Sequence, residues 1–253
     1  MRDAPDIPPD TALVTGGGSG LGETIVRGLH GAGYRVAVTD IDGDKAQAVA
    51  RTLDPAGETA IGLPLDVTDA AAIESATAQI EARWGAVQVL VNNAVLTRAV
   101  PVLDITLDDW DQVMAVNARG TFAASQILAR RMKAAGYGRI VNMASLAGQN
   151  GGTATGAHYA ASKGAIITLT KVFARDLAPF GITVNAIAPG PIDSPMVRAL
   201  VPADKMAGMV AGIPVGRLGD AAFIADMVVR LAARDACFVT GATWDINGGL
   251  FMR

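Results

Sequence analysis

Short apolar runs alternate with longer amphipathic stretches along the whole chain. The apolar runs predict strands over 11–15, 34–40, 59–65, 87–92, 138–143, 182–188 and 242–246. The stretches between them predict helices over 21–32, 44–53, 69–83, 106–134, 159–179 and 220–233. Strands that alternate with helices pair in parallel, and the helices cover both faces of the sheet. The pattern therefore predicts an α/β fold with three layers, doubly wound around a mostly parallel sheet.

Two segments depart from this rhythm. Residues 1–10 are rich in proline and aspartate and have no apolar core, which predicts a loose tail and not a signal peptide. Residues 189–219 are rich in proline, glycine and methionine. They follow the sixth strand, beyond whose carboxyl end ligands bind in such sheets, so we predict a substrate lid there. No linker divides the chain, and 1–253 is predicted to be a single domain.

Composition narrows the class of protein. Hydrophobic residues make up 51% of the 253 residues, enough for a core on both faces of a sheet. The net charge is −3 and no basic block is present, so we expect neither nucleic acid nor a membrane surface as partner. No apolar run is long enough to span a membrane, and we expect a cytoplasmic protein. Cys237 is the only cysteine, which excludes an internal disulfide and a cysteine-based metal site.

A glycine-rich turn joins the first predicted strand to the first helix. Glycines let a backbone turn tightly and approach a pyrophosphate, and the N–H groups at the start of a helix attract the phosphates. Because the turn lies between a strand and a helix, it predicts a dinucleotide site. The candidate residues are Gly16, Gly18, Ser19, Gly20, Leu21 and Gly22.

An acidic residue, Asp40, ends the second predicted strand. A carboxylate about 20 residues beyond the glycines can accept both ribose hydroxyls of NAD, and it repels the 2′-phosphate of NADP. Ser19 and Ile41 stand where a basic residue would favour that phosphate. The alternative role of Asp40 is a helix cap, for which Asp42 and Asp44 are better placed. We therefore expect NAD(H) to be preferred over NADP(H).

Tyr159 and Lys163 are four residues apart in a predicted helix and so share one face. A phenol ordinarily has a pKa near ~10, and a neighbouring cation lowers this pKa toward working pH. The pair suits acid–base catalysis, although a tyrosine packed on a lysine stem is also common. The glycine turn favours the catalytic interpretation. Ser145 lies directly after the apolar run 139–144. We give His158 no catalytic role, because neighbouring residues on a helix point apart.

Together these motifs resemble the short-chain dehydrogenase/reductase family over nearly the whole chain. The resemblance implies a Rossmann fold and a second group of cofactor contacts. Asp66 and Val67 resemble the pair beside adenine, and Asn92-Asn93-Ala94 resembles the fourth-strand motif that borders the cofactor. The segment that grips the nicotinamide carboxamide is similar to Pro189, Gly190, Ile192 and Ser194.

The resemblance also assigns four catalytic residues: Asn117, Ser145, Tyr159 and Lys163. It implies that Tyr159 and Lys163 also contact the cofactor, and that Asn117 holds a water connecting Lys163 to solvent. The alternative role for Asn117 is a simple helix irregularity. The chain departs from the family pattern at Val95, which replaces a glycine, and in a loop, 151–156, that is one residue longer than usual.

We therefore expect an oxidoreductase that interconverts a secondary alcohol and a ketone with NAD(H). A 3-oxoacyl-thioester reductase is the alternative, although Gly136 and Phe180 stand where such reductases offer basic residues to a carrier protein. An enoyl reductase would space its tyrosine and lysine more widely. A catalytically silent cofactor-binding regulator would have lost Ser145, Tyr159 or Lys163. The substrate is left open, with an apolar pocket wall suggested by Leu96, Met196, Leu200, Met206 and Met209.

The predicted helices over 106–134 and 159–179 carry more apolar residues than one sheet-facing stripe needs. An apolar helix surface requires cover on its outer side, or else these residues fill a single-chain core. The family resemblance favours the first alternative and implies a homotetramer.

Overall fold

The computed structural model describes residues 10–152, 155–194, 197–198 and 201–252. Among these residues one sheet has the strand order β3-β2-β1-β4-β5-β6-β7, and neighbouring strands are parallel. Its strands are β1 (Thr11–Thr15), β2 (Arg35–Asp40), β3 (Ala60–Pro64), β4 (Val89–Asn92), β5 (Gly138–Met143), β6 (Ile182–Pro189) and β7 (Thr243–Ile246).

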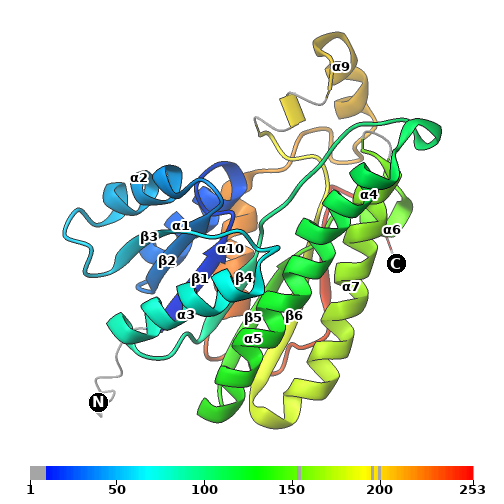
Figure 1. Cartoon of the computed structure of the whole chain (residues 1–253). Helices are drawn as coiled ribbons and strands as arrows, with labels where there is room; N and C mark the ends of the chain where they lie inside the picture. Colours follow the sequence, from blue (N-terminus) through cyan, green and yellow to red (C-terminus); the bar gives the residue numbers. More distant parts are fainter. Residues whose placement is uncertain (1–9, 153–154, 195–196, 199–200, 253) are drawn as a thin grey trace, which may run out of the picture.

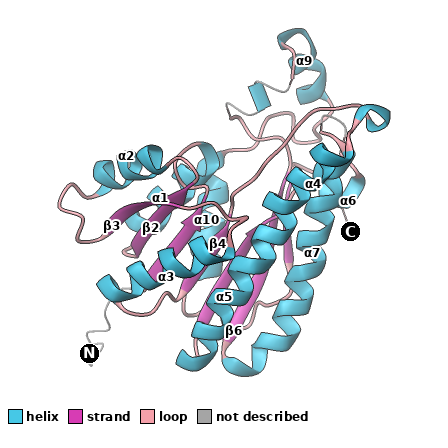
Figure 2. Ribbon diagram, in the orientation of Figure 1, coloured by secondary structure: helices cyan, strands magenta, loops and turns pink. Residues whose placement is uncertain are grey.

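The helices are α1 (Gly20–Gly31), α2 (Gly43–Leu53), α3 (Ala70–Trp84), α4 (Leu107–Met114), α5 (Gly120–Ala135), α6 (Ala147–Asn150), α7 (Ala157–Leu177), α9 (Ala203–Ala211) and α10 (Ala221–Ala232). They lie on both faces of the sheet (Figure 1, Figure 2), which confirms the predicted three-layer α/β Rossmann fold. The chain winds outward from β1 in one direction and from β4 in the other, and ligands bind where such a reversal occurs.

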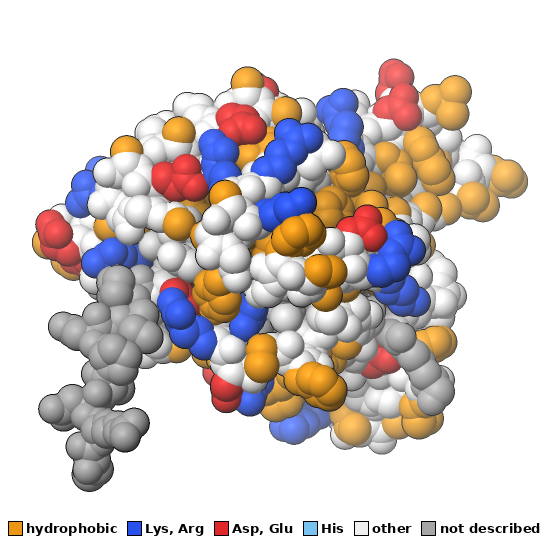
Figure 3. Space-filling model, turned by 90° about the horizontal axis from the view of Figure 1, so that it is seen from below, with side chains coloured by type: hydrophobic (Ala, Val, Ile, Leu, Met, Phe, Trp, Pro, Cys, Tyr) orange, Lys and Arg blue, Asp and Glu red, His pale blue; other side chains and the backbone are white. Residues whose placement is uncertain are grey.

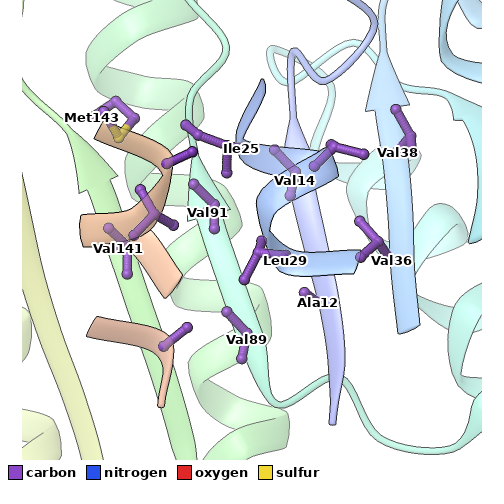
Figure 4. Close-up of a cluster of buried hydrophobic side chains, with 14 of the residues drawn as sticks. Ala12, Val14, Ile25, Leu29, Val36, Val38, Val89, Val91, Val141 and Met143 are labelled. Carbon is purple, nitrogen blue, oxygen red and sulfur yellow. The ribbon is translucent and has the colours of Figure 1, made fainter. Parts of the chain in front are cut away.

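Each face of the sheet has its own apolar cluster. On one face α1, α2 and α10 pack on the strands, and Figure 4 shows Ile25 and Leu29 of α1 among strand residues such as Val91. On the other face, α3 and α5 contribute residues that include Ile73 and Leu128. Burying a side chain of this size contributes about 2 kcal/mol. The central strands are buried on both sides, which explains why they are almost continuously apolar in the sequence.

The helix predicted over 106–134 is instead two helices separated by a π-helical turn, η2 (Ala115–Arg119). Thr106 caps the start of α4, and its side chain accepts a hydrogen bond from the Asp109 N–H. A π turn inserts one extra residue into a helix, and such turns are frequent at functional sites. The apolar spacing could not show it, because apolar residues continue through the insertion. Asn117 lies in this turn and is completely buried.

Residues 1–9 of the tail predicted over 1–10 lie outside the described part of the chain. The last residue of the predicted tail, Asp10, is not loose. Asp10 is buried, and its carboxylate accepts hydrogen bonds from Arg234 and from the Tyr137 hydroxyl. Its carbonyl accepts the Arg35 N–H at 3.1 Å. Asp10 thus ties β2 to the chain beyond α10 at the amino-terminal edge of the sheet. Figure 3 views the molecule from below, and basic and acidic side chains are interspersed on the face it shows.

The segment predicted as a lid, 189–219, contains the end of β6 and α9. A bridge between Ile192 and Gly219 brings its two ends together, and the Asp193 N–H donates to the Gly219 carbonyl at 3.0 Å. Residues 195–196 and 199–200, which include Met196 and Leu200 of the predicted pocket wall, are outside the described residues. The role of this segment as a lid stays a prediction. No helix among the residues described is both long and apolar enough to cross a membrane.

Candidate active site

The glycine turn lies where the carboxyl ends of β1 and β4 meet. The Thr15 hydroxyl accepts the N–H groups of Asn93 and Ala94, at 3.0 and 3.1 Å. The Asn93 side-chain amide in turn donates to the carbonyls of Thr15 and Gly16, at 3.1 and 2.9 Å. Asn93 and Ala94, both predicted cofactor contacts, therefore hold the start of the turn against β4.

Three glycines of the turn make contacts that a side chain would prevent. A Cβ at Gly22 would lie 2.0 Å from the Gly16 carbonyl oxygen. A Cβ at Gly16, where φ is +64°, would lie 2.8 Å from the Cα of Ala94. At Gly18 the nearest atom would be a carboxylate oxygen of Asp40, at 2.9 Å. Glycine is therefore required at these positions for the turn to close.

The start of α1 fits an anionic group. Ser19 is the N-cap residue, but its side chain makes no capping hydrogen bond. Gly20 has φ +56° and open space around it, and Leu21 packs against the adjacent apolar cluster. Backbone N–H groups of the first helical turn lack partners within the helix, and the helix dipole makes this end partly positive. The turn could therefore hold a pyrophosphate.

Asp40 lies directly beside this turn. Its Oδ2 accepts the Gly18 N–H at 3.0 Å, and its Oδ1 accepts the Asp42 N–H at 3.1 Å. Each carboxylate oxygen keeps a further lone pair that could accept a ribose hydroxyl. Lys45, which no sequence motif indicated, also lies here, since its Cβ would be 2.9 Å from a Cβ at Gly18. The Lys45 ammonium lies 3.2 Å from the Asp42 carboxylate, which balances its charge.

Three further predicted cofactor contacts follow β2 and β3: Ile41, and the pair expected beside adenine, Asp66 and Val67. Ile41 is 76% exposed beside Asp40, and an apolar side chain this exposed offers a surface to a flat ring. Asp66 is exposed, and its carboxylate accepts the Thr68 N–H at 2.8 Å. Val67 is buried against α5, where a Cβ at Gly120 would come within 2.8 Å of it.

The segment after β6 is held on both sides. The Pro189 carbonyl accepts the Leu146 N–H at 2.9 Å, next to Ser145. The Gly190 N–H donates to the Ile246 carbonyl at 2.9 Å, at the end of β7. This places near Ser145 the segment that contains the predicted nicotinamide contacts Pro189, Gly190, Ile192 and Ser194.

Lys163 is buried inside the protein between α7 and β5. Its ammonium donates to the Met143 carbonyl at 2.6 Å and lies 5.7 Å from the centre of the Tyr159 ring. Burial lowers the pKa of Lys163 to about 7, because the protein interior disfavours a charge. A Cβ at Gly148 would lie 2.5 Å from the Lys163 backbone, so this glycine lets α6 approach α7 closely.

Ser145 and Tyr159 are brought together as predicted, but the pKa of the phenol moves the other way. Burial raises the pKa of Tyr159, and a hydrogen bond with Ser145 opposes this rise. The expected lowering by Lys163 does not appear, because that ammonium is itself desolvated and bonded to Met143. The Ser145 hydroxyl oxygen also accepts the Ala147 N–H at 3.1 Å, which fixes its position.

Asn117 uses its side chain on protein groups. Its amide oxygen accepts the Leu96 N–H at 2.7 Å, and its amide nitrogen donates to the Leu96 carbonyl and the Ser162 hydroxyl, each at 2.9 Å. Ser162, which no sequence motif indicated, donates to the Tyr159 carbonyl at 2.7 Å. The water-holding role expected for Asn117 stays a prediction. Asn117 joins the π turn and the loop after β4 to α7.

His158, to which we gave no catalytic role, is completely buried next to Tyr159. Its Nδ1 accepts the Tyr159 N–H at 3.0 Å, and its Nε2 has no partner. The signal available in the sequence was its position immediately before the helix predicted over 159–179, because the first N–H groups of a helix need acceptors.

A buried polar network behind the site was also missed. The Asn92 amide donates to Ser125 and to Asn142, at 2.9 and 2.8 Å, and the Asn142 amide donates to Thr170 at 2.9 Å. The network connects β4 and β5 to α5 and α7, and among these elements β5 precedes Ser145 and α7 carries Tyr159 and Lys163. The sequence feature that could have indicated this network is the presence of asparagines inside apolar strands, because a buried amide requires hydrogen-bond partners.

Known proteins support the family suggested by these motifs. A family model described as enoyl-(acyl carrier protein) reductase matches residues 16–251. The 3-oxoacyl-[acyl-carrier-protein] reductase FabG of Escherichia coli (strain K12) is 40% identical, and the match covers 95% of this chain and 97% of that protein. The sorbitol dehydrogenase of Cereibacter sphaeroides is 37% identical over 96% of this chain and 97% of its own.

A crystal structure of a short-chain type dehydrogenase/reductase from Mycobacterium marinum superimposes with a TM-score of 0.91, at 31% identity and with 98% of each chain covered. The chain is a short-chain dehydrogenase/reductase. This short-chain dehydrogenase/reductase is therefore an oxidoreductase that uses NAD(P)(H) and acts on a small molecule. The glycine turn and the start of α1 fit the dinucleotide of such a cofactor.

Proposed function

We propose that the enzyme transfers hydride between NAD(H) and a secondary alcohol/ketone pair, with Ser145, Tyr159 and Lys163 as its catalytic residues. The observation that supports this most is the convergence of three groups: Ser145 is hydrogen-bonded to Tyr159, and the Lys163 ammonium lies 5.7 Å from the same ring. A regulator that had lost catalysis would have no need for this arrangement, so an active enzyme is favoured.

Each residue has a distinct task in this mechanism. The Ser145 hydroxyl donates to the substrate oxygen, where negative charge develops in the transition state. Tyr159 delivers a proton from its phenol oxygen in reduction and accepts one in oxidation. A bound nicotinamide cofactor supplies or takes up the hydride. Lys163 binds ribose hydroxyls, which would solvate its ammonium, and only in that charged state would it oppose the rise in the Tyr159 pKa that burial causes.

NAD(H) is the proposed cofactor. Asp40 is held beside the glycine turn by the N–H groups of Gly18 and Asp42, where its carboxylate would bind ribose hydroxyls and repel a 2′-phosphate. Lys45 is the nearby basic residue that could favour the phosphate, but it is paired with Asp42.

A 3-oxoacyl-thioester reductase is the second candidate. It is favoured by the name of the Escherichia coli relative. Gly136 and Phe180 stand where such reductases offer basic residues to a carrier protein, but this region does not lack a basic residue. Lys133 lies with its ammonium 3.8 Å from the centre of the Phe180 ring and supplies a cation there. The spacing of Tyr159 and Lys163 on α7 disfavours an enoyl reductase.

We also propose a homotetramer. Phe122 of α5 and Val172 of α7 are each 40% exposed, and the rings of Phe122 and Phe173 are 5.8 Å apart. This apolar face spans two neighbouring helices and suits a self-complementary contact with a second copy. Fully exposed Phe238 and largely exposed Met252 near the C-terminus suit a further contact.

The phenol of Tyr159 is tested by Tyr159→Phe, which keeps the ring and removes the proton donor. We expect kcat for ketone reduction to fall by roughly 100-fold or more, the usual scale for lost acid–base catalysis. Affinity for NADH, measured by fluorescence titration, should change little. Tyr34→Phe, remote from Ser145, is the control and should keep its kcat. Near-normal turnover of Tyr159→Phe would rule out this role.

Cofactor preference is tested by comparing kcat/KM for NADH and NADPH. The intact enzyme should favour NADH, because Asp40 repels the additional phosphate. Asp40→Ala should shift the ratio toward NADPH, whereas Asp44→Ala, an exposed acid in the next helix, should leave it unchanged. An equal or better kcat/KM of the intact enzyme with NADPH would contradict the proposal.

Oligomeric state is tested by size exclusion with light scattering at micromolar concentration. We expect a mass about four times the chain mass of 25.9 kDa. Phe122→Asp should yield a smaller species, because a charge would be buried in the proposed contact. A monomeric mass for the unaltered protein would overturn this proposal and leave the enzyme assignment intact.

A further inference from the structure

The start of α7 lacks the side chain that usually caps the beginning of a helix. Its N-cap residue is Gly156, which makes no side-chain capping bond. The first hydrogen bond within the helix runs from the Ala160 N–H to the Gly156 carbonyl, at 3.2 Å. The N–H groups of the three helical residues before Ala160 therefore have no acceptor within the helix backbone. Tyr159 is the third of these residues, and its N–H needs an acceptor from elsewhere.

Position 156 cannot carry a capping side chain. A Cβ there would lie 2.4 Å from His158 Cε1, 2.7 Å from His158 Nδ1 and 3.0 Å from the Arg98 carbonyl oxygen. The serine, threonine, aspartate or asparagine that ordinarily caps a helix is therefore excluded. The same Arg98 carbonyl accepts the Gly156 N–H at 3.0 Å, which ties the start of α7 to the loop after β4. The ring of His158 thus occupies the space that a capping side chain would need.

The His158 ring supplies the missing acceptor. Its Nδ1 accepts the Tyr159 N–H at 3.0 Å, so in the neutral ring the proton is on Nε2. The ring is completely buried, and Nε2 has no partner among the described residues. A buried donor without a partner is unfavourable, and native proteins retain few of them. An apolar side chain would avoid this cost, but it would leave the Tyr159 N–H without its acceptor.

The acceptor acts on the backbone of Tyr159 and not on its phenol. Neighbouring residues on a helix point apart, so the imidazole and the phenol leave α7 in different directions. On the other side of the same residue, the Tyr159 carbonyl accepts the Ser162 hydroxyl at 2.7 Å. Side chains of α7 therefore bond both backbone polar groups of Tyr159. These bonds fix the point from which the phenol extends to its hydrogen bond with Ser145.

We propose that His158 is a positioning residue, whose neutral ring holds the first turn of α7 through the Tyr159 N–H and so keeps the phenol at the substrate oxygen. The inference rests on the proposed role of Tyr159 as proton donor. His158 touches neither substrate nor cofactor in this role. Loss of the acceptor would free the first turn of α7, and a displacement of about 1 Å at a reacting group can lower the rate roughly 100-fold.

Two variants of nearly equal shape test this role. Asparagine and leucine have the same branching at Cγ, but only asparagine places an acceptor oxygen where His158 Nδ1 lies. We expect His158→Leu to lower kcat for ketone reduction by about tenfold or more, whereas His158→Asn should retain most of it. Affinity for NADH, measured by fluorescence titration, should be unchanged in both variants, because the lost acceptor displaces the phenol and leaves the glycine turn intact.

A double-variant cycle shows whether His158 acts through the phenol. Tyr159→Phe already lacks the proton donor, so adding His158→Leu should leave its residual kcat nearly unchanged. The inference would be overturned by a near-normal kcat of His158→Leu, by an equal fall in His158→Asn, by a parallel loss of NADH affinity, or by the same fall in the Tyr159→Phe background. Each of these outcomes leaves the proposed function standing. An unaltered enzyme that reduces no ketone with NADH would overturn both.

Discussion

The buried ammonium of Lys163 is the constraint on which the catalytic arrangement depends. A charge in the protein interior is costly, and Lys163 meets this cost with a hydrogen bond to the last residue of β5 and a pKa lowered to about 7. The same contact fixes α7 on the sheet and so places Tyr159 beside Ser145. A lysine held in this way is suited to gain from the hydroxyls of a bound ribose, since they would solvate its charge.

The remaining architecture brings a dinucleotide to that lysine. The strand order reverses between β1 and β4, and at this point Asn93 fixes the start of the glycine turn. The buried asparagines of β4 and β5 connect the same strands to α5 and α7. Hydrogen bonds thus anchor both the cofactor site and the catalytic site to adjacent strands, at the carboxyl edge of the sheet.

The sequence predicted those features that depend on local pattern. Alternating apolar runs were sufficient for the sheet, and the glycine turn, Asp40 and the Tyr159–Lys163 spacing indicated the site. It did not show features that arise from packing. The π turn at Asn117, the hydrogen bond from the Tyr159 N–H to His158 and the ion pair of Asp10 with Arg234 each join residues by tertiary contacts. The direction of the shift in the Tyr159 pKa was also predicted wrongly, because the position of Lys163 four residues away does not show how deeply the phenol is buried.

The burial of Lys163 is tested most directly by the pH dependence of the free energy of unfolding, measured with urea and without added dinucleotide. The unfolded chain keeps this proton up to a pH near the usual pKa of 10.5, whereas the folded chain releases it near 7. Stability should therefore rise between these pH values by on the order of 3 to 5 kcal/mol more in the unaltered protein than in Lys163→Met. Lys171→Met, which alters an exposed lysine of the same helix, should retain the rise. The same rise in Lys163→Met as in the unaltered protein would contradict the account.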